Sequence, residues 1–264
     1  MNAWLLVRTL EILCALSLVI QCIEYLKLQK HTQTKGVWSW PVQRADIPLS
    51  NPRVLKFLDF IFLDDTHEKH LLLRLLVALS MILMGSHLLI AVFLFLSTLL
   101  LLIRWRGAFN GGSDFMTLVV LTGLLIAHVV AIFAGPEVGW SAGLWYIAIH
   151  AISSYFMSGW VKLINKQWRN GQALSIFLDS GLYGPLSAQS IFRRPFIAVL
   201  CSWSFIIWEA LSPFALFNQQ WALIYCLIAG IFHFLVFVFF GLNRFFWAWA
   251  AGFPAIVFSA GWRW

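Results

Sequence analysis

Three ionisable side chains lie inside or at the rim of long apolar stretches: Lys162, Glu209 and His233. A charge in such surroundings is costly unless it is paired, so each of these residues needs a partner or a function. A desolvated lysine gives up its proton more easily, and Lys162 is therefore a candidate base or Schiff-base former. Alternatively, its stem lies along apolar surface while its amine reaches the polar interface beside Lys166 and Arg169.

Glu209 and His233 each lie well inside one of two successive apolar runs. Because successive membrane helices are usually antiparallel neighbours, we expect these two side chains to meet, either as a polar clamp or as a proton relay. A hydrogen bond from Glu209 to another neighbouring helix is the alternative. Lys162, Glu209 and His233 are thus the candidate catalytic residues.

Trp160, Trp168 and His150 are weaker candidates, for binding a cofactor. Tryptophans near helix ends usually anchor a protein at the membrane interface, but their rings can also stack on a quinone-like lipid. An intramembrane histidine can ligate haem, yet it more often bonds a backbone carbonyl. No two histidines have a ligand-like spacing within one apolar helix, and His67 with His70 does not form an HExxH motif. We therefore predict no metal site, and a quinone-like lipid is favoured over haem.

The composition indicates the kind of protein that must position these residues. Hydrophobic residues make up 61% of the 264 positions, charged residues 11%, and the mean hydropathy is +0.83. Soluble domains carry about a quarter charged residues, and helices that cross a bilayer are the simplest way to bury so much apolar surface. The sequence predicts an all-α fold, a polytopic transmembrane helical bundle in a single domain over 1–264.

The apolar runs predict about eight spans joined by two longer polar segments. A turn at 85–87 divides the long run 71–103, and the loop 134–140 ends the fourth span. We expect an interfacial cytoplasmic segment at 24–70 and an interfacial or re-entrant segment near 164–192. The expected spans are 3–23, 71–84, 88–103, 115–134, 141–163, 195–211, 220–240 and 245–261.

The net charge of +7 fits this topology and not a nucleic-acid partner. If the loops alternate sides, 16 of the 18 lysines and arginines gather on one side, which the positive-inside rule makes cytoplasmic, with both termini outside. The first helix lacks a small-x-small cleavage pattern, so we interpret it as uncleaved. Arg8 and Glu11 in this helix are spaced to form an ion pair, and Asp114 is expected to cap the start of a later helix.

Two blocks of residues resemble the horizontally transferred transmembrane (HTTM) family, which includes the membrane domain of vitamin K-dependent gamma-carboxylase. The resemblance extends over roughly 70–262, so 71–264 is the HTTM-like helical core. The first block is Tyr155, Phe156, Gly159, Lys162 and Leu163, followed by Trp168, Gly171, Ala173 and Leu174. The second is Trp208, Glu209 and Pro213, then Phe232, His233 and 243–246.

The resemblance implies a role for Lys162 as the base that deprotonates a hydroquinone cofactor. It suggests a membrane protein that takes part in peptide or protein maturation with a quinone-like cofactor. Carboxylation itself is not implied, because Gly111 and Gly112 stand where the carboxylase has a histidine. The alternative is a non-catalytic membrane subunit that anchors or assembles a partner polypeptide. For either function the charge pattern predicts a bacterial inner membrane location.

Overall fold

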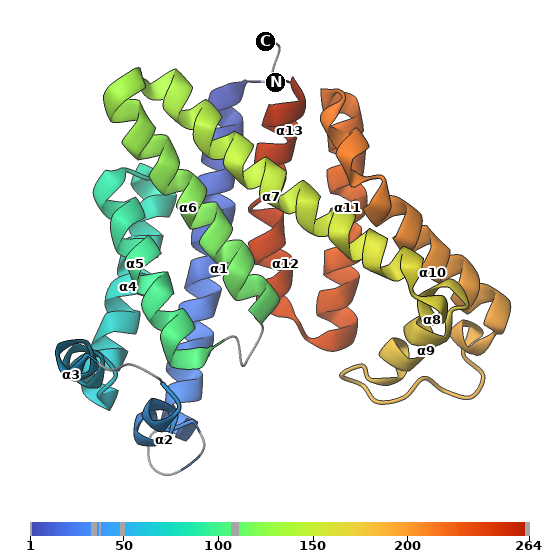
Figure 1. Cartoon of the computed structure of the whole chain (residues 1–264), viewed down its shortest axis with the longest axis horizontal. Helices are drawn as coiled ribbons and strands as arrows, with labels where there is room; N and C mark the ends of the chain where they lie inside the picture. The colour runs from blue at the N-terminus through green and yellow to red at the C-terminus, as the bar shows by residue number, and fades with distance from the viewer. Residues whose placement is uncertain (1, 33–35, 37, 48–50, 107–110, 262–264) are drawn as a thin grey trace.

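The computed structural model describes residues 2–32, 36, 38–47, 51–106 and 111–261, and every regular element in these ranges is a helix (Figure 1). The predicted all-α class is confirmed. The longer helices are α1 (Ala3–Thr32), α4 (Asp64–Met84), α5 (Leu88–Trp105), α6 (Gly111–Ala134), α7 (Pro136–Ile164), α10 (Pro195–Ala210) and α11 (Gln219–Phe240). The shorter ones are α2 (Trp40–Ala45), α3 (Pro52–Ile61), α8 (Lys166–Arg169), α9 (Gln172–Asp179), η1 (Ile191–Arg193), η2 (Ser212–Leu216), α12 (Asn243–Ala250) and α13 (Phe253–Gly261).

Five helices of the described chain are long and apolar enough to cross a membrane: α1, α5, α6, α7 and α11. The other three expected spans do not meet these criteria, each for a different reason. In α4 the apolar stretch still contains Glu68, Lys69 and Arg74. Helix α10 has only 16 residues, and the last expected span is broken at 251–252 into α12 and α13. Length and composition therefore identify an integral membrane protein but not a count of eight.

The first polar segment differs from the expected interfacial stretch at 24–70. Helix α1 continues to Thr32, because no proline or glycine interrupts it and the polar residues Gln21 and Gln29 turn into the bundle, where both are buried. Helix α4 begins at Asp64, and the described residues between the two long helices form α2 and α3. The expected first helix over 1–23 is thus the first part of a longer one.

The two ends of the bundle differ in character (Figure 1). Helix α1 begins and α13 ends at the same end, where the α4–α5 and α6–α7 turns also lie. Helices α2, α3, α8 and α9 lie at the opposite end, in the segments that carry most of the lysines and arginines. The arrangement of the chain therefore separates basic and non-basic ends as the charge pattern predicts.

Helices α6 and α7 form a close antiparallel hairpin built on glycine. A Cβ atom on Gly139 or Gly143 would collide with the backbone of α6, at the carbonyl oxygens of Ala127 and Gly123. Such small-xxx-small spacing lets two membrane helices approach closely. The expected loop 134–140 is wrong, since Gly135 alone makes the turn with a φ of +86° and Pro136 starts the next helix.

A buried network of charged and polar groups joins four helices. Arg244 of α12 donates from Nη1 to Asp114 of α6 at 3.1 Å, and Asp114 also accepts from Gln21 of α1 at 2.9 Å. Arg74 of α4, which is fully buried, donates to the carbonyl oxygen of the Gln21 amide at 3.0 Å. The Nε of Arg244 lies 2.9 Å from a carboxylate oxygen of Glu24. Two buried cations and two anions thus belong to the network, and the side chain of one of these anions, Glu24, is 42% exposed.

This network explains why Asp114 is not the helix cap that its position suggests. The residue lies in the first turn of α6 as expected. Its carboxylate is instead buried and bonded to Gln21 and Arg244, with the Tyr25 hydroxyl at 3.4 Å. A guanidinium from another helix stabilises a buried carboxylate more than exposed helix N–H groups do.

The predicted pairing of Arg8 with Glu11 is confirmed, at 2.6 Å. Glu11 also accepts from the backbone N–H and the hydroxyl of Ser86, at 2.7 and 2.6 Å, and Arg8 donates to the carbonyl of Ile82 at 2.7 Å. The pair therefore fixes the α4–α5 turn, in which Gly85 has a φ of +83°. This turn lies where the sequence predicts it, at 85–87.

The buried network yields a stability prediction. Arg244→Met leaves the carboxylate of Asp114 buried without its cation, which should lower the free energy of unfolding by about 3–5 kcal/mol. The matched control is Arg193→Gln, which breaks an Arg–Asp pair of similar length, 2.9 Å, whose side chains are more than a third exposed. Its loss should cost no more than about 1 kcal/mol. Denaturant unfolding in micelles measures the free energy of unfolding of both variants. Equal losses would show that burial does not determine how much breaking an ion pair destabilises the protein.

Candidate functional site

The last turns of α7 run antiparallel to α10, and small residues set the contact. Gly159 packs against the backbone of Glu209 and Ala210 so closely that a Cβ atom would collide with the Ala210 nitrogen. The hydroxyl of Ser212 donates to the Ile152 carbonyl at 3.1 Å on one side of this contact. Beyond α8, Gly171 adopts a φ of +76° and turns the chain back along α10. These contacts fix Lys162 and Glu209 opposite each other.

Lys162 and Glu209 form an ion pair, with Nζ and Oε2 2.5 Å apart. The side chains are 16% and 4% exposed, so the pair is largely shielded from solvent. The ammonium also donates to the Ser158 hydroxyl at 2.5 Å and lies 5.2 Å from the centre of the Trp168 ring. Each partner stabilises the charged form of the other. The amine of Lys162 therefore has side-chain partners within the bundle and does not stand free at the surface.

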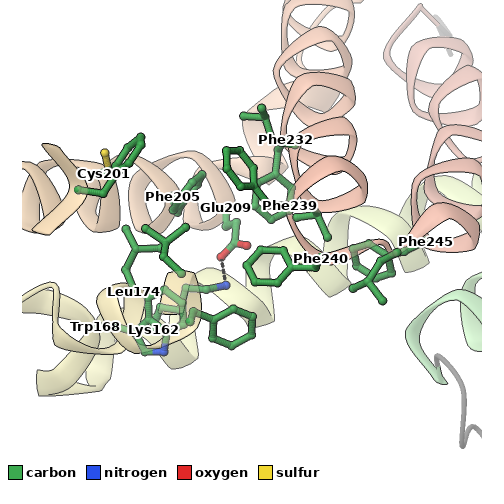
Figure 2. A pocket seen from close by; sticks show the side chains of 16 residues that line it. Lys162, Trp168, Leu174, Cys201, Phe205, Glu209, Phe232, Phe239, Phe240 and Phe245 are labelled. Carbon is green, nitrogen blue, oxygen red and sulfur yellow. Dashed lines mark hydrogen bonds and ion pairs between the residues drawn. The ribbon is translucent and has the colours of Figure 1, made fainter. Parts of the chain in front are cut away.

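The pair lies in the wall of an apolar cavity of about 450 Å³ between α7–α9, α10 and α11 (Figure 2). Figure 2 shows the Lys162 amine pointing to the Glu209 carboxylate, with phenylalanine rings around them. Trp168 and Cys201 add an indole and a thiol, and the remaining lining residues are aliphatic or phenylalanine. The phenylalanines are Phe177, Phe192, Phe205, Phe232, Phe239, Phe240 and Phe245.

The cavity opens toward the outer surface of the bundle. Four of its lining residues are also exposed on that surface: Phe177 of α9, Leu235 and Phe239 of α11, and Leu242. Helix α11 is one of the apolar helices long enough to cross a membrane, so this surface would face acyl chains.

The expected pairing of Glu209 with His233 is wrong. His233 is buried, and its Nε2 lies 2.6 Å from the hydroxyl of Tyr155, while Glu209 pairs with Lys162. The position of a residue along its span predicts its depth, but not the side of the helix on which it lies. The His233 ring stacks on Trp249 and touches the edge of Phe245, which puts it behind the cavity wall.

The three weaker candidates do not come together. Trp168 lines the cavity and lies over the Lys162 amine. Trp160 is 47% exposed and stacks on Phe156, and His150 is exposed with its Nδ1 2.9 Å from the Tyr146 carbonyl oxygen. Two residues along a helix correspond to a rotation of about 200°, so their side chains point in nearly opposite directions. Trp160 therefore points away from the site that Lys162 faces.

Ser158, Cys201 and the phenylalanine wall are site residues that the sequence reasoning missed. Ser158 precedes Lys162 by four residues, a spacing that puts both on one helix face. Phe232, Val236, Phe239 and Phe240 follow the i, i+4, i+7, i+8 pattern of a single helical stripe. Because α11 is apolar on all sides, the sequence does not distinguish this stripe from the other faces of the helix. Only the folded structure shows which face lines the cavity.

Among the residues that the structure describes, no group of three or more histidine, cysteine, aspartate or glutamate side chains could hold a metal ion. The cavity offers only Glu209 and Cys201 as possible ligands, and Glu209 is engaged by Lys162. Its walls suit an organic molecule better than an ion. Comparison with known proteins adds no name: no family model, curated protein or solved structure matches this chain.

The glycine contact yields a prediction about the geometry of the site. Gly159→Ala should separate α7 from α10, because the new methyl group meets backbone atoms that cannot move aside. We expect a loss of about 1–3 kcal/mol in unfolding free energy and faster alkylation of Cys201, which lies on α10 inside the cavity. The control is Gly111→Ala, since no atom of the described residues lies within 4 Å of a Cβ at Gly111. Unchanged alkylation in the Gly159 variant would contradict the close contact.

Proposed function

We propose that this chain is an HTTM-like integral membrane protein that binds a quinone-like lipid with its polar head at Lys162 and Glu209. One observation carries the proposal: an apolar cavity with exposed lining residues on α11 has the ion pair of Lys162 and Glu209 in its wall. An isoprenoid or acyl tail can lie along the phenylalanine walls. A ring with oxygen substituents can reach the pair.

The residues present fit such a molecule. A volume of about 450 Å³ lies within the range of about 300–1,000 Å³ found for small-molecule sites. These sites are mostly apolar with a few polar groups that fix the orientation of the ligand, which describes this cavity. Trp168 offers an indole face beside the Lys162 amine, on which an aromatic head group can stack.

The ion pair provides both halves of an acid–base site. A hydroquinone-like ligand would supply a phenolic hydroxyl whose proton can be removed. Glu209, as a carboxylate, accepts a proton at Oε2, and the Lys162 ammonium donates a hydrogen bond to the oxygen that loses it. Ser158 holds the Lys162 side chain in place. In this assignment Glu209 is the base and Lys162 stabilises the anion, the reverse of the role that the resemblance gives to lysine.

The reaction class follows from the resemblance: maturation of a peptide or protein with a lipophilic cofactor. His233 then supports the site from behind, because it orients Tyr155 at the back of the cavity wall. The same proposal includes eight spans, with α4, α10 and α12–α13 crossing alongside the five long helices. It also includes an inner membrane location, with the basic end of the bundle in the cytoplasm.

A second candidate is a non-catalytic membrane subunit that holds a partner polypeptide. The closeness of Lys162 to Glu209 supports it, since a fully satisfied buried ion pair also acts as a clamp between α7 and α10. In that function the cavity holds structural lipid. The two candidates differ in one respect. In the first, binding of a molecule in the cavity depends on contacts between its polar head group and the ion pair, and in the second it does not.

Native mass spectrometry of the protein extracted gently from its membrane tests the proposal. We expect a bound quinone-class molecule in the wild type and its loss in Lys162→Met/Glu209→Leu, which replaces the pair by apolar groups without leaving a lone charge. Lys166→Met, in the exposed helix α8, should retain the molecule.

Two outcomes would contradict this proposal. A partner polypeptide with no quinone-class molecule would favour the subunit. Equal retention in the double variant and in Lys166→Met would show that the ion pair does not bind the head group. Tryptophan fluorescence confirms that each variant is folded before the comparison is made.

A further inference from the structure

A second group of buried polar side chains lies away from the cavity, at the basic end of the bundle. It consists of His67 and His70 in the first turns of α4 and Arg104 in the last turn of α5. His67 is 2% exposed and Arg104 is 4% exposed, and His70 is half-buried beside them. Neither the ion pair at Lys162 nor the Arg244 network includes any of these residues.

Arg104 is a buried cation without an anionic partner. Its Nη2 donates to the carbonyl of Trp38 at 2.8 Å, and its guanidinium carbon lies 4.2 Å from the centre of the Trp105 ring. Its Nε and Nη1 have no hydrogen-bond partner, and among the described residues no carboxylate lies within ion-pair distance. Asp64 attracts it from further away. Unpaired buried charges are rare because they cost several kcal/mol.

The two histidines add further donors to the same place. Neither ring nitrogen of His67 has a hydrogen-bond partner in the described part of the chain, and its ring lies 6.2 Å from Trp105, the ring that Arg104 covers. His70 lies 6.0 Å from His67 between ring centres, and its Nε2 is 2.7 Å from the Ser97 hydroxyl, while its Nδ1 has no partner. Each neutral imidazole carries one N–H that can be donated.

The charge state of these rings follows from their surroundings. Burial, with a contribution from Arg104, lowers the pKa of His67 to about 3. Burial and the charge of Arg74 lower the pKa of His70 to about 4. Both rings are therefore neutral near pH 7, and the charge of the group is that of Arg104. A metal cation would be repelled by the guanidinium, whereas an anion would be attracted and would find N–H donors.

We infer that His67, His70 and Arg104 form a binding site for a phosphate group. Phosphate accepts several hydrogen bonds at once, and guanidinium is the side chain that matches it best. The site lies beneath α2, because Trp40 of α2 packs on Phe62 and Phe62 packs on His67. It thus lies at the end of the bundle where basic residues gather, so the phosphate comes from a lipid headgroup or from free phosphate.

The test uses the full chain in nanodiscs of a neutral lipid, in which inorganic phosphate or phosphatidylglycerol is titrated at constant ionic strength. We expect a rise in melting temperature with one of the two. Arg104→Gln should weaken the binding by about tenfold or more, as the loss of charge-assisted hydrogen bonds implies. Arg106→Gln is the matched control two residues away, since Arg106 is exposed and already bonded to Gln43 and Asp46.

His67→Phe distinguishes a binding role from a packing role. If His67 only fills space, phenylalanine removes two unpartnered nitrogens, so the melting temperature rises and the response to phosphate is kept. If His67 binds phosphate, the response is lost even in a protein that is more stable without ligand. A response to phosphate ions identifies free phosphate, and a response to the lipid alone identifies a headgroup.

Either of these responses supports the site. The inference would be overturned if the protein responded to neither probe. It would also be overturned if Arg104→Gln and Arg106→Gln responded equally. Sodium chloride at matched ionic strength controls for general screening. The test does not depend on the cavity at Lys162, so its outcome is separate from that of the proposed quinone-like ligand.

Discussion

A charge inside an apolar bundle needs polar partners that replace water, and much of the fold depends on how this requirement is met. Arg244 near the end of the chain reaches Asp114 in its middle and Glu24 near its beginning. The contact closes α12 onto α1 and α6, and Gln21 extends it to Arg74 in α4. Hydrophobic packing between membrane helices is not directional, because lipid is as apolar as the helix surface. The polar contacts therefore determine which faces meet.

The same requirement governs the candidate site. Lys162 and Glu209 neutralise each other, and the pair holds α7 against α10 at the one place where Gly159 lets the two backbones touch. A pair that stabilises the fold also supplies a proton acceptor beside a hydrogen-bond donor. Under the proposed function both members would serve both purposes, so changing one residue would not separate the structural role from the chemical one.

The sequence predicts the helix content well. It predicts poorly which side of each helix packs against its neighbours. Long apolar runs identify the helices, and Gly85 and the pair of Arg8 with Glu11 appear where spacing along one helix predicts them. Lys162 and Glu209 are also recognisable, because a charge in an apolar run is conspicuous. The pairing of these two residues with each other cannot be recognised from the sequence, because it depends on how two helices distant in sequence are rotated about their axes.

The missed contacts share that cause. Nothing local indicates that Asp114 faces Gln21 and Arg244 instead of its own helix end, or that His233 meets Tyr155. Helix boundaries fail for a more local reason. Gly135 followed by Pro136 makes a complete turn in fewer residues than the expected loop 134–140. Glycine, proline and the charged Glu137 are typical of loops, but the first turn of a helix accepts proline and glutamate equally well.

The length of α7 has a consequence for the membrane around it. Its 29 residues extend about 43 Å at 1.5 Å per residue, whereas the hydrocarbon core is about 30 Å thick. A slanted course accommodates such a length, and in Figure 1 α7 runs diagonally across the neighbouring helices. One end is fixed to α6 by Gly139 and Gly143, and the other carries Lys162. The angle at which α7 crosses α10 therefore determines where Lys162 meets Glu209.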